Sequence, residues 1–280
     1  MLDAPTAVDP ARVTLVGVAD GEVGSDQVRA VWDDLAEFWD EAMRSGRTWQ
    51  ERLIAPAVES LLSLRPGEAV LELSCGNGAF ARQMTSAGAR VVASDLSPRM
   101  IELAREHGGD VDYRVVDATD VSAMLDLAQP DGYDAAVSNM AVMDMPAVAP
   151  MAEAVHMLVR PGGRFVVSLL HPAFNSGDVT RVVEESDDHR GVVRTHSLRR
   201  STYIRSSTHQ GVAVEGQPRV QWYFHRPLQD LVNPFFSHGW VLDGLLEPVL
   251  DEAEEGVFAH LPGVIVLRFR RLADSSTGTG

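Results

Sequence analysis

The sequence has 280 residues and contains no lysine, so all 24 of its basic residues are arginine. A chain without lysine forms no Schiff base and has no phosphate-binding loop of the lysine-containing type. Cys75 is the one cysteine, which excludes an internal disulfide and a metal site built from several cysteines. No apolar run is long enough to cross a membrane, and residues 1–20 lack a basic segment followed by a hydrophobic one. We therefore expect a cytoplasmic protein that does not bind membranes.

Positive charge is also scarce, because the formal net charge is −16. Proteins that bind nucleic acids in general present a cationic surface, which releases counterions from the phosphates. The charge therefore predicts no nucleic-acid partner, and it is compatible with an enzyme that acts on a small molecule. The length allows one large core, alone or with a small subdomain. The oligomeric state stays open, with a homodimer among the alternatives.

The stretch from residue 69 to residue 80 organises the rest of the chain. It begins with an apolar run interrupted only by Glu72, which predicts a buried strand, and at Ser74 it passes into small and glycine residues. Residues 79–87 then predict a helix. The loop between them would expose backbone amide donors at the N-terminus of that helix, which is typical of a loop that holds a nucleotide-like cofactor.

Two cofactor classes fit this loop. Residues 76–81 match the dinucleotide pattern G-x-G-x-x-A. Glu72 favours the other class, because a buried carboxylate repels a pyrophosphate and attracts a ligand with ammonium and sulfonium groups. The spacing Glu72-x-Ser74-x-Gly76-x-Gly78 resembles motif I of the class I S-adenosylmethionine-dependent methyltransferases, [DE]-x-G-x-G-x-G, with serine in place of the first glycine. The resemblance implies S-adenosylmethionine as cofactor and S-adenosylhomocysteine as its product.

Acidic residues also end the next two predicted strands. Asp95 stands 19 residues after Gly76, where a doubly wound fold places an acid beside the ribose hydroxyls. Ser97 is suited to cap the following helix, which leaves Asp95 available to the cofactor. Asp117 follows the third strand, and in the resembled family an acid at this position accepts a hydrogen bond from the adenine amino group. Three carboxylates at three neighbouring strand ends therefore converge on one cofactor.

Further cofactor contacts are expected from the surrounding loops and from the helix that precedes the sheet. In the resembled family an aromatic–Asp pair on this leading helix, here Trp39 with Asp40, lies over the pocket mouth. Ligands of doubly wound sheets bind where the strand order reverses, which places Asn139 and Met140 beside the reacting centre. The full set of expected cofactor-binding residues is Trp39, Glu72, Ser74, Cys75, Gly76, Gly78, Asp95, Leu96, Met100, Asp117, Ala118, Asn139 and Met140.

Acceptor-side residues are predicted around the same edge of the sheet. His171 directly follows a strand and His225 lies where an insertion returns to the core, so each is a candidate general base. The residues expected to contact the acceptor are Trp32, Met143, Asp144, Phe174, Tyr203 and Tyr223. Arginines are in local excess in the insertion, which is either a solvated hairpin or a lid that binds an acidic acceptor. Its histidines are irregularly spaced, so no metal site is expected.

The resemblance implies an α/β fold, a Rossmann-like doubly wound sheet of seven strands with an antiparallel last strand, N-terminal helices and a lid insertion after strand five. We divide the chain into an N-terminal arm with a covering helix (1–47), a cofactor-binding core (48–176), a lid (177–221), the remainder of the core (222–272) and a tail (273–280). Strands are expected at 69–73, 90–95, 111–116, 133–138, 164–170, 240–246 and 263–270, with weaker ones at 13–18, 191–196 and 201–206. Helices are expected at 27–44, 49–64, 79–87, 146–159 and 228–238.

The function that follows is transfer of a methyl group from S-adenosylmethionine to a small molecule. The expected acceptor is an oxygen, in a hydroxyl or carboxylate of a specialised metabolite, and His171 or His225 takes the proton where a hydroxyl reacts. Two alternatives stay open. One is a protein that binds S-adenosylmethionine and catalyses another reaction or none, and the other is a dinucleotide-dependent oxidoreductase.

Overall fold

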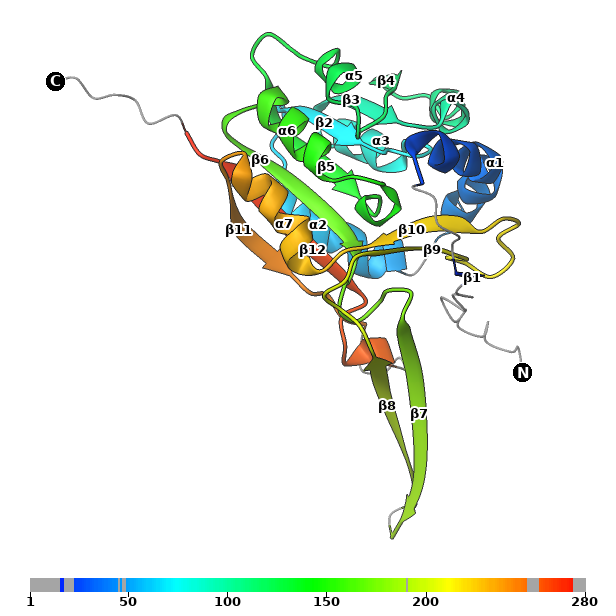
Figure 1. Cartoon of the computed structure of the whole chain (residues 1–280). Helices are drawn as coiled ribbons and strands as arrows, with labels where there is room; N and C mark the ends of the chain where they lie inside the picture. Colours follow the sequence, from blue (N-terminus) through cyan, green and yellow to red (C-terminus); the bar gives the residue numbers. More distant parts are fainter. Residues whose placement is uncertain are drawn as a thin grey trace, which may run out of the picture.

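The computed structural model describes residues 16–17, 23–44, 46, 49–189, 191–250 and 257–273. The strands of its largest sheet are β2 (Ala69–Leu73), β3 (Arg90–Asp95), β4 (Val111–Val115), β5 (Tyr133–Asn139), β6 (Val159–Leu170), β11 (Trp240–Leu246) and β12 (Val264–Arg271). They lie in the order β11-β12-β6-β5-β2-β3-β4 (Figure 1). Neighbours from β6 to β4 are parallel, whereas β12 is antiparallel to both β11 and β6. The predicted doubly wound seven-stranded sheet with an antiparallel last strand is confirmed.

Helices cover both faces of this sheet. They are α1 (Ser25–Arg44), η1 (Gln50–Ile54), α2 (Ala55–Leu62), α3 (Ala79–Ser86), α4 (Pro98–Glu106), α5 (Val121–Leu125), η2 (Val142–Asp144), α6 (Ala149–Leu158), α7 (Leu228–Ser237) and η3 (Val257–Ala259). One apolar cluster joins the sheet to α5, α6 and α7, and a second joins it to α2, α3 and α4. Because both faces are covered, β2 is buried along its whole length, which explains its almost continuous apolar sequence.

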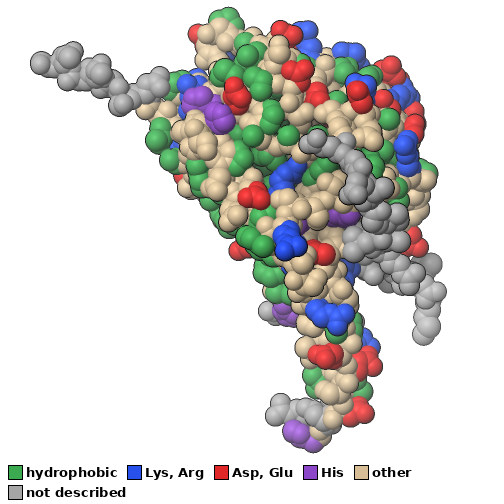
Figure 2. All heavy atoms as spheres, viewed as in Figure 1, with side chains coloured by type: hydrophobic (Ala, Val, Ile, Leu, Met, Phe, Trp, Pro, Cys, Tyr) green, Lys and Arg blue, Asp and Glu red, His purple; other side chains and the backbone are tan. Residues whose placement is uncertain are grey.

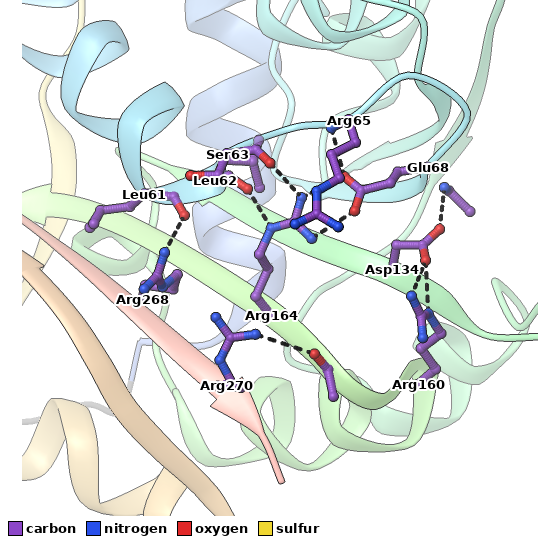
Figure 3. Close-up of polar contacts among 12 residues, drawn as sticks. Leu61, Leu62, Ser63, Arg65, Glu68, Asp134, Arg160, Arg164, Arg268 and Arg270 are labelled. Carbon is purple, nitrogen blue, oxygen red and sulfur yellow. Dashed lines mark hydrogen bonds and ion pairs between the residues drawn. The ribbon is translucent and has the colours of Figure 1, made fainter. Parts of the chain in front are cut away.

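Arginine side chains tie the amino-terminal edge of the sheet to the end of α2. Arg164 of β6 donates to both carboxylate oxygens of Glu68, over 3.0 and 2.5 Å, and to the carbonyl oxygen of Leu62 (Figure 3). Arg160 pairs with Asp134 at the start of β5. The planar guanidinium suits such paired contacts, so arginine here holds the scaffold at the edge opposite the carboxyl ends of the parallel strands.

The segment between β6 and α7 forms two smaller sheets. β9 (Ser207–Gly211) lies between β1 (Val16–Gly17) and β10 (Gln221–His225), and all the pairings in this sheet are antiparallel. β7 (Val179–Asp188) and β8 (Gly191–Arg200) form a long hairpin that projects away from the rest of the molecule (Figures 1 and 2). Among the described helices, none has the length and apolar character needed to cross a membrane.

The insertion is where the predicted elements and the observed ones differ. The strand predicted at 191–196 lies within β8, but β7 has no predicted counterpart. The strand predicted at 201–206 is wrong, because these residues form bends and the next strand begins at Ser207. Side chains bind this turn instead: Arg200 donates to the carbonyl oxygen of Thr202, whose hydroxyl donates to Asp178. Of the edge strand predicted at 13–18, only residues 16–17 are described, and most of the tail lies outside the described residues.

Candidate active site

A cavity of about 1900 Å³ lies at the carboxyl ends of the central parallel strands. Its walls come from the loops after β2, β3, β4 and β5, from α1, from η2, and from β9, β10 and the base of the β7–β8 hairpin. The loops after the strands are consecutive βα connections, whereas β9 and β10 belong to the insertion and its return to the core. The cavity therefore has two ends of different origin, which we call the cofactor end and the acceptor end.

The glycine loop turns the chain from β2 into α3 through three residues in the left-handed region, Ser74 (φ 57°), Gly76 (φ 54°) and Gly78 (φ 73°). A Cβ atom at Gly78 would lie 2.3 Å from the Oη of Tyr113, so this glycine is required for packing beneath the loop. A Cβ atom at Gly76 would meet nothing within 4 Å, so here the backbone borders open space. Ser74 stands where the related motif has glycine, and its positive φ gives the reason for that preference.

Glu72 and Asp95 are buried acids at the floor of the cofactor end. Glu72 is 2% exposed and its Oε2 has no hydrogen-bond partner among the residues that the structure describes, while burial and the nearby Asp95 raise the pKa of Glu72 to about 8. Asp95 accepts hydrogen bonds of 2.9 Å from the backbone amides of Gly76 and Ser97, yet burial still raises its pKa to about 6. Burial thus disfavours negative charge on both groups, and a cationic ligand would offset that cost.

Asp117 and Ser97 complete the strand ends on this side. Asp117 lines the cavity, and its Oδ1 accepts from the backbone amide and the hydroxyl of Thr119. Ser97 accepts a hydrogen bond from the amide of Met100 over 3.1 Å, which confirms its predicted role as the cap of α4. The three predicted acids, Glu72, Asp95 and Asp117, therefore line one cavity.

Helix α1 is tied to the cofactor end by polar contacts, which include Asp40. This residue is 7% exposed and accepts from the side-chain amide of Asn77 in the glycine loop over 2.9 Å and from Nε2 of His107 over 2.6 Å. Near the start of the helix, Asp33 accepts from the Ser97 hydroxyl over 2.5 Å. The resemblance placed the pair Trp39 and Asp40 over the pocket mouth, but it did not predict the hydrogen bond between Asp40 and Asn77.

Most of the predicted site residues line this one cavity. They are Trp39, Glu72, Ser74, Cys75, Gly76, Asp95, Leu96, Met100, Asp117, Ala118, Asn139 and Met140 at the cofactor end, with Trp32, Met143, Asp144, Tyr223 and His225 among the acceptor-side predictions. Four of the predicted residues are not among its lining residues, namely Gly78, His171, Phe174 and Tyr203. Tyr203 instead accepts from the amide of Leu228 and so caps the start of α7.

His171 is engaged on both ring nitrogens. Its Nδ1 accepts from the backbone amide of Ala173 over 3.1 Å, and its Nε2 then donates to Glu247 over 2.8 Å. The ring also packs against Phe174, with 4.6 Å between the ring centroids. Burial lowers the pKa of His171, so its neutral form is favoured. These contacts fix the turn after β6 and leave neither nitrogen directed at the cavity.

His225 differs from His171 because it lines the cavity. Its Nε2 lies 2.9 Å from the carbonyl oxygen of Tyr203, and a hydrogen bond to that oxygen requires the proton on Nε2 and the lone pair on Nδ1. Nη2 of Arg200 lies 2.9 Å from the same Nε2 and 3.4 Å from Nδ1, and burial lowers the pKa of His225. Arg200 also forms an ion pair with Asp178 over 2.8 Å, which commits this arginine of the insertion to the fold.

Sequence reasoning missed Gln221 and His209 on the acceptor side. His209 of β9 pairs directly with Tyr223 of β10, and their rings stack with 5.5 Å between the centroids. Gln221 binds Asp144, and both line the cavity. Residues 221, 223 and 225 alternate along β10 and share one face of the strand, so this period of two was the available signal.

Comparison with known proteins agrees with this geometry. Residues 71–167 match the family described as "Methyltransferase domain". The ubiquinone biosynthesis O-methyltransferase of Xanthomonas campestris pv. campestris is 34% identical over 110 residues, which are 38% of this chain and 44% of the relative. The matched region thus spans less than half of that relative's length.

Two solved structures share the fold over most of the chain. An S-adenosylmethionine dependent methyltransferase from Mesorhizobium loti has a TM-score of 0.63 at 22% identity, covering 81% of this chain and 99% of the other. The 1,6-didemethyltoxoflavin-N1-methyltransferase of Burkholderia thailandensis, solved with S-adenosylhomocysteine, has a TM-score of 0.52 at 17% identity, covering 97% and 98%.

The fold is shared with S-adenosylmethionine-dependent methyltransferases of known structure, and the family match identifies a methyltransferase domain within this chain. Residues 71–167 of this chain form its family-matched core, which runs from β2 to β6. The match over residues 71–167 agrees with the predicted methyltransferase family and not with the alternative of a dinucleotide-dependent oxidoreductase.

Proposed function

We propose that the protein methylates a hydroxyl group of a small, uncharged acceptor with S-adenosylmethionine. The observation that carries this proposal is the continuity of the cavity: buried acids lie at one end, and the other end is lined by Asp144, by polar and aromatic side chains of β9 and β10, and by Arg226, which is committed to backbone carbonyl oxygens. The curated relatives act as O-methyltransferases by name, which favours oxygen as the methylated atom. A carboxylate acceptor is less suited to the space beside Asp144 and Gln221, because it brings no donor for Oε1 of Gln221, which is buried without a partner among the described residues.

The residues of the cofactor end fit S-adenosylmethionine. The unpartnered Oε2 of Glu72 lies where a cationic ligand would compensate it, and the open space at Gly76 lets a ligand approach the loop backbone. We assign Asp95 to the ribose hydroxyls and Asp117 to the adenine. The cofactor supplies a methyl group already activated by its sulfonium charge, so the protein mainly has to align two reactants and exclude water. Helix α1, with Trp32 and Trp39, covers this end and contributes to that exclusion.

A hydroxyl nucleophile also requires a group that takes its proton. Of the two predicted bases, His225 has the suitable geometry, because it lines the cavity and its Nε2 is held by the Tyr203 carbonyl. We assign the proton to Nε2 on the strength of this contact, which leaves the lone pair on Nδ1, with Nη2 of Arg200 3.4 Å away from it. His171 has no such position, since Ala173 and Glu247 occupy its nitrogens. We therefore propose His225 as the general base and a structural role for His171.

Calorimetry with S-adenosylmethionine and S-adenosylhomocysteine tests the first half of the proposal. Both should bind the wild-type protein, and Asp95→Ala should weaken both by about tenfold or more, since it removes a charged hydrogen-bond acceptor. Asp126→Ala, a change at an exposed acid on the end of α5, is the control. Absence of heat with both compounds would contradict the proposal at its base.

Release of S-adenosylhomocysteine with a panel of neutral phenols tests the second half. His225→Ala should lower the rate at saturating acceptor, whereas His171→Ala should act through stability and leave the rate of the folded fraction close to wild type. Tight cofactor binding without turnover on any neutral hydroxyl compound would instead favour a protein that binds the cofactor for another reaction.

A further inference from the structure

The acceptor end contains a buried polar pair that the fold itself does not satisfy. Gln221 of β10 is 2% exposed, and its Oε1 has no hydrogen-bond partner among the described residues. Its Nε2 donates to Oδ1 of Asp144 over 3.3 Å, and in the described part of the chain this is the one hydrogen bond that the Asp144 carboxyl group makes. Leaving a buried amide oxygen without a donor is unfavourable. Because both residues line the cavity, a ligand is the natural source of the missing donor.

The surroundings of Asp144 keep its carboxyl group uncharged. Two strands pack against η2: β10 carries Tyr223 and His225 and is followed by Arg226, and β6 carries Arg160 and Arg164, which pair with Asp134 and Glu68. His209 of the neighbouring β9 lines the same cavity. Arg226 donates to the carbonyl oxygens of Met145 and Pro146, each over 2.7 Å, and so is committed to the backbone. Burial raises the pKa of Asp144 well above its ordinary value. In the neutral form Oδ1 accepts from Gln221 and the protonated oxygen is a donor, so the pair offers a donor beside an acceptor.

We infer that Asp144 and Gln221 bind an uncharged ring that carries a hydrogen-bond donor next to an acceptor, as a catechol-type diol or a lactam does. The inference rests on the proposed function and names the acceptor class for the same site. Oε1 of Gln221 accepts the O–H or N–H of the ring, and the Asp144 hydroxyl donates to the neighbouring oxygen. Tyr223 and His209, stacked on each other, border the same space. An ionised carboxylate brings no donor for Oε1 of Gln221, so it would leave this buried oxygen unpaired.

Ligand-observed NMR on the protein loaded with S-adenosylhomocysteine tests this inference with four probes. Catechol and 2-pyridone present a donor beside an acceptor, 1,2-dimethoxybenzene lacks the donor, and benzoate is an anion. We expect saturation transfer to catechol, to 2-pyridone or to both, which also distinguishes the diol from the lactam. Binding of benzoate as strong as that of the neutral donors overturns the inference, as does binding of 1,2-dimethoxybenzene equal to that of catechol.

Variants locate the binding on the pair. Gln221→Leu should weaken the binding of the preferred probe by about tenfold, since it removes one buried hydrogen bond and leaves the ligand donor unpaired. Gln221→Glu should abolish probe binding, because it places a charge beside Asp144. The control is Gln229→Glu, the same substitution at an exposed position of α7. All variants should bind S-adenosylhomocysteine as the wild type does. If the wild type does not bind S-adenosylhomocysteine, the proposed function is refuted. If Gln221→Leu binds the probe as the wild type does, only this inference is refuted.

The pH dependence of probe affinity reports on the protonation of Asp144, and it would not change if Asp144 had only a structural role. Probe affinity of the wild type should fall at alkaline pH, as the carboxyl group loses its proton and stops donating. Asp144→Asn keeps a donor and an acceptor at the same place, so it should retain affinity within a few-fold and remove this fall. An unchanged pH profile in Asp144→Asn would assign the titration to another group and overturn the role of Asp144 as donor.

Discussion

The cofactor end and the acceptor end of the cavity are built from different parts of the chain. At the cofactor end, each functional side chain stands at the end of a parallel strand or in the loop that follows it, and carboxylates dominate. At the acceptor end, Asp144 comes from η2 after β5, whereas His209 and Gln221 come from antiparallel strands of the insertion and its return. The parallel sheet thus supplies the buried acids of the cofactor end, whereas β9 and β10 supply most of the side chains at the acceptor end.

The largest effect that tests this contrast is expected within the glycine loop. Gly78→Ala would place a Cβ atom 2.3 Å from the Tyr113 Oη in a left-handed backbone, and Gly76→Ala would place one in open space. We expect Gly78→Ala to lower the free energy of unfolding by about 1–2 kcal/mol for the backbone and about 1–3 kcal/mol for overpacking. Gly76→Ala should lose only the backbone contribution. Urea unfolding with an unchanged m-value measures both.

The affinity for S-adenosylhomocysteine should rank Gly76→Ala and Gly78→Ala in a different order from their free energies of unfolding. Gly76 borders the space where the cofactor is proposed to lie, so its added methyl group opposes binding directly even though the fold tolerates it. The comparison breaks if Gly76→Ala binds S-adenosylhomocysteine as the wild type does, because the open space would then not belong to the cofactor.

The sequence predicted the sheet and the cofactor end because their signals are local. Glu72, Asp95 and Asp117 each follow an apolar run, and parallel strands bring the carboxyl ends of such runs to one edge. His209 and Gln221 reach the cavity through the antiparallel register of β9 and β10, in which His209 faces Tyr223. The register between two strands depends on which face of the pair is buried and on the geometry of the turn that joins them. The sequence of one strand by itself predicts neither.

The misplaced strand at 201–206 has a related cause. These residues have strand-like neighbours in the sequence, but the hydrogen-bonding capacity of Arg200 and Thr202 goes to a turn. The contact from Asp40 to Asn77 was equally hidden, because it joins residues 37 positions apart through side chains on a helix and a loop. Polar contacts of this kind follow from the tertiary arrangement rather than from any sequence pattern.

The second largest effect should be the pH dependence that Glu72 gives to the cofactor end. The folded, cofactor-free protein holds a proton on Glu72 up to a pKa of about 8, whereas the unfolded chain releases it near 4.5. The stability of the cofactor-free protein should therefore fall as pH rises from 5 to 8. Glu72→Gln has no such proton to lose, so its curve should be flatter over the same range. Thermal unfolding at constant ionic strength checks this.

Cofactor affinity should change in the opposite direction, because the ionised form of Glu72 attracts a cation. Below its pKa the ionised fraction rises by up to about tenfold per pH unit, so affinity for S-adenosylmethionine should increase between pH 6 and pH 7.5. Calorimetry in buffers of different ionisation enthalpy should show proton release on binding. An affinity that is independent of pH in the wild type would mean that Glu72 does not respond to the bound charge.

A moderate effect is expected from the contact that ties α1 to the glycine loop. Asp40→Ala leaves the amide of Asn77 and the ring of His107 without their buried acceptor, so we expect about 1–3 kcal/mol lower stability. We also expect about tenfold weaker binding of S-adenosylhomocysteine, because the loop loses its support from the covering helix. Glu37 lies on the same helix as Asp40 and forms an exposed ion pair with Arg99 of α4. Glu37→Ala breaks this pair and should change stability and cofactor affinity by little. Equal effects of the two substitutions would remove Asp40 from the description of the cofactor end.

The smallest effect should follow from shortening the β7–β8 hairpin. Val183 and His196 form a cross-strand pair and both line the cavity, whereas residues 184–195 do not appear among its lining residues. Replacing 184–195 by Asn-Gly retains this pair and closes the strands with a favoured two-residue turn. Because a two-stranded hairpin contributes little stability by itself, the unfolding midpoint should stay close to that of the wild type, and the affinity for S-adenosylhomocysteine should stay within about twofold.

A large loss of cofactor affinity would show that the outer hairpin acts on the cofactor end, and the separation of the two ends would then fail. If only acceptor turnover falls, the hairpin belongs with β9 and β10 to the part of the molecule that selects the acceptor.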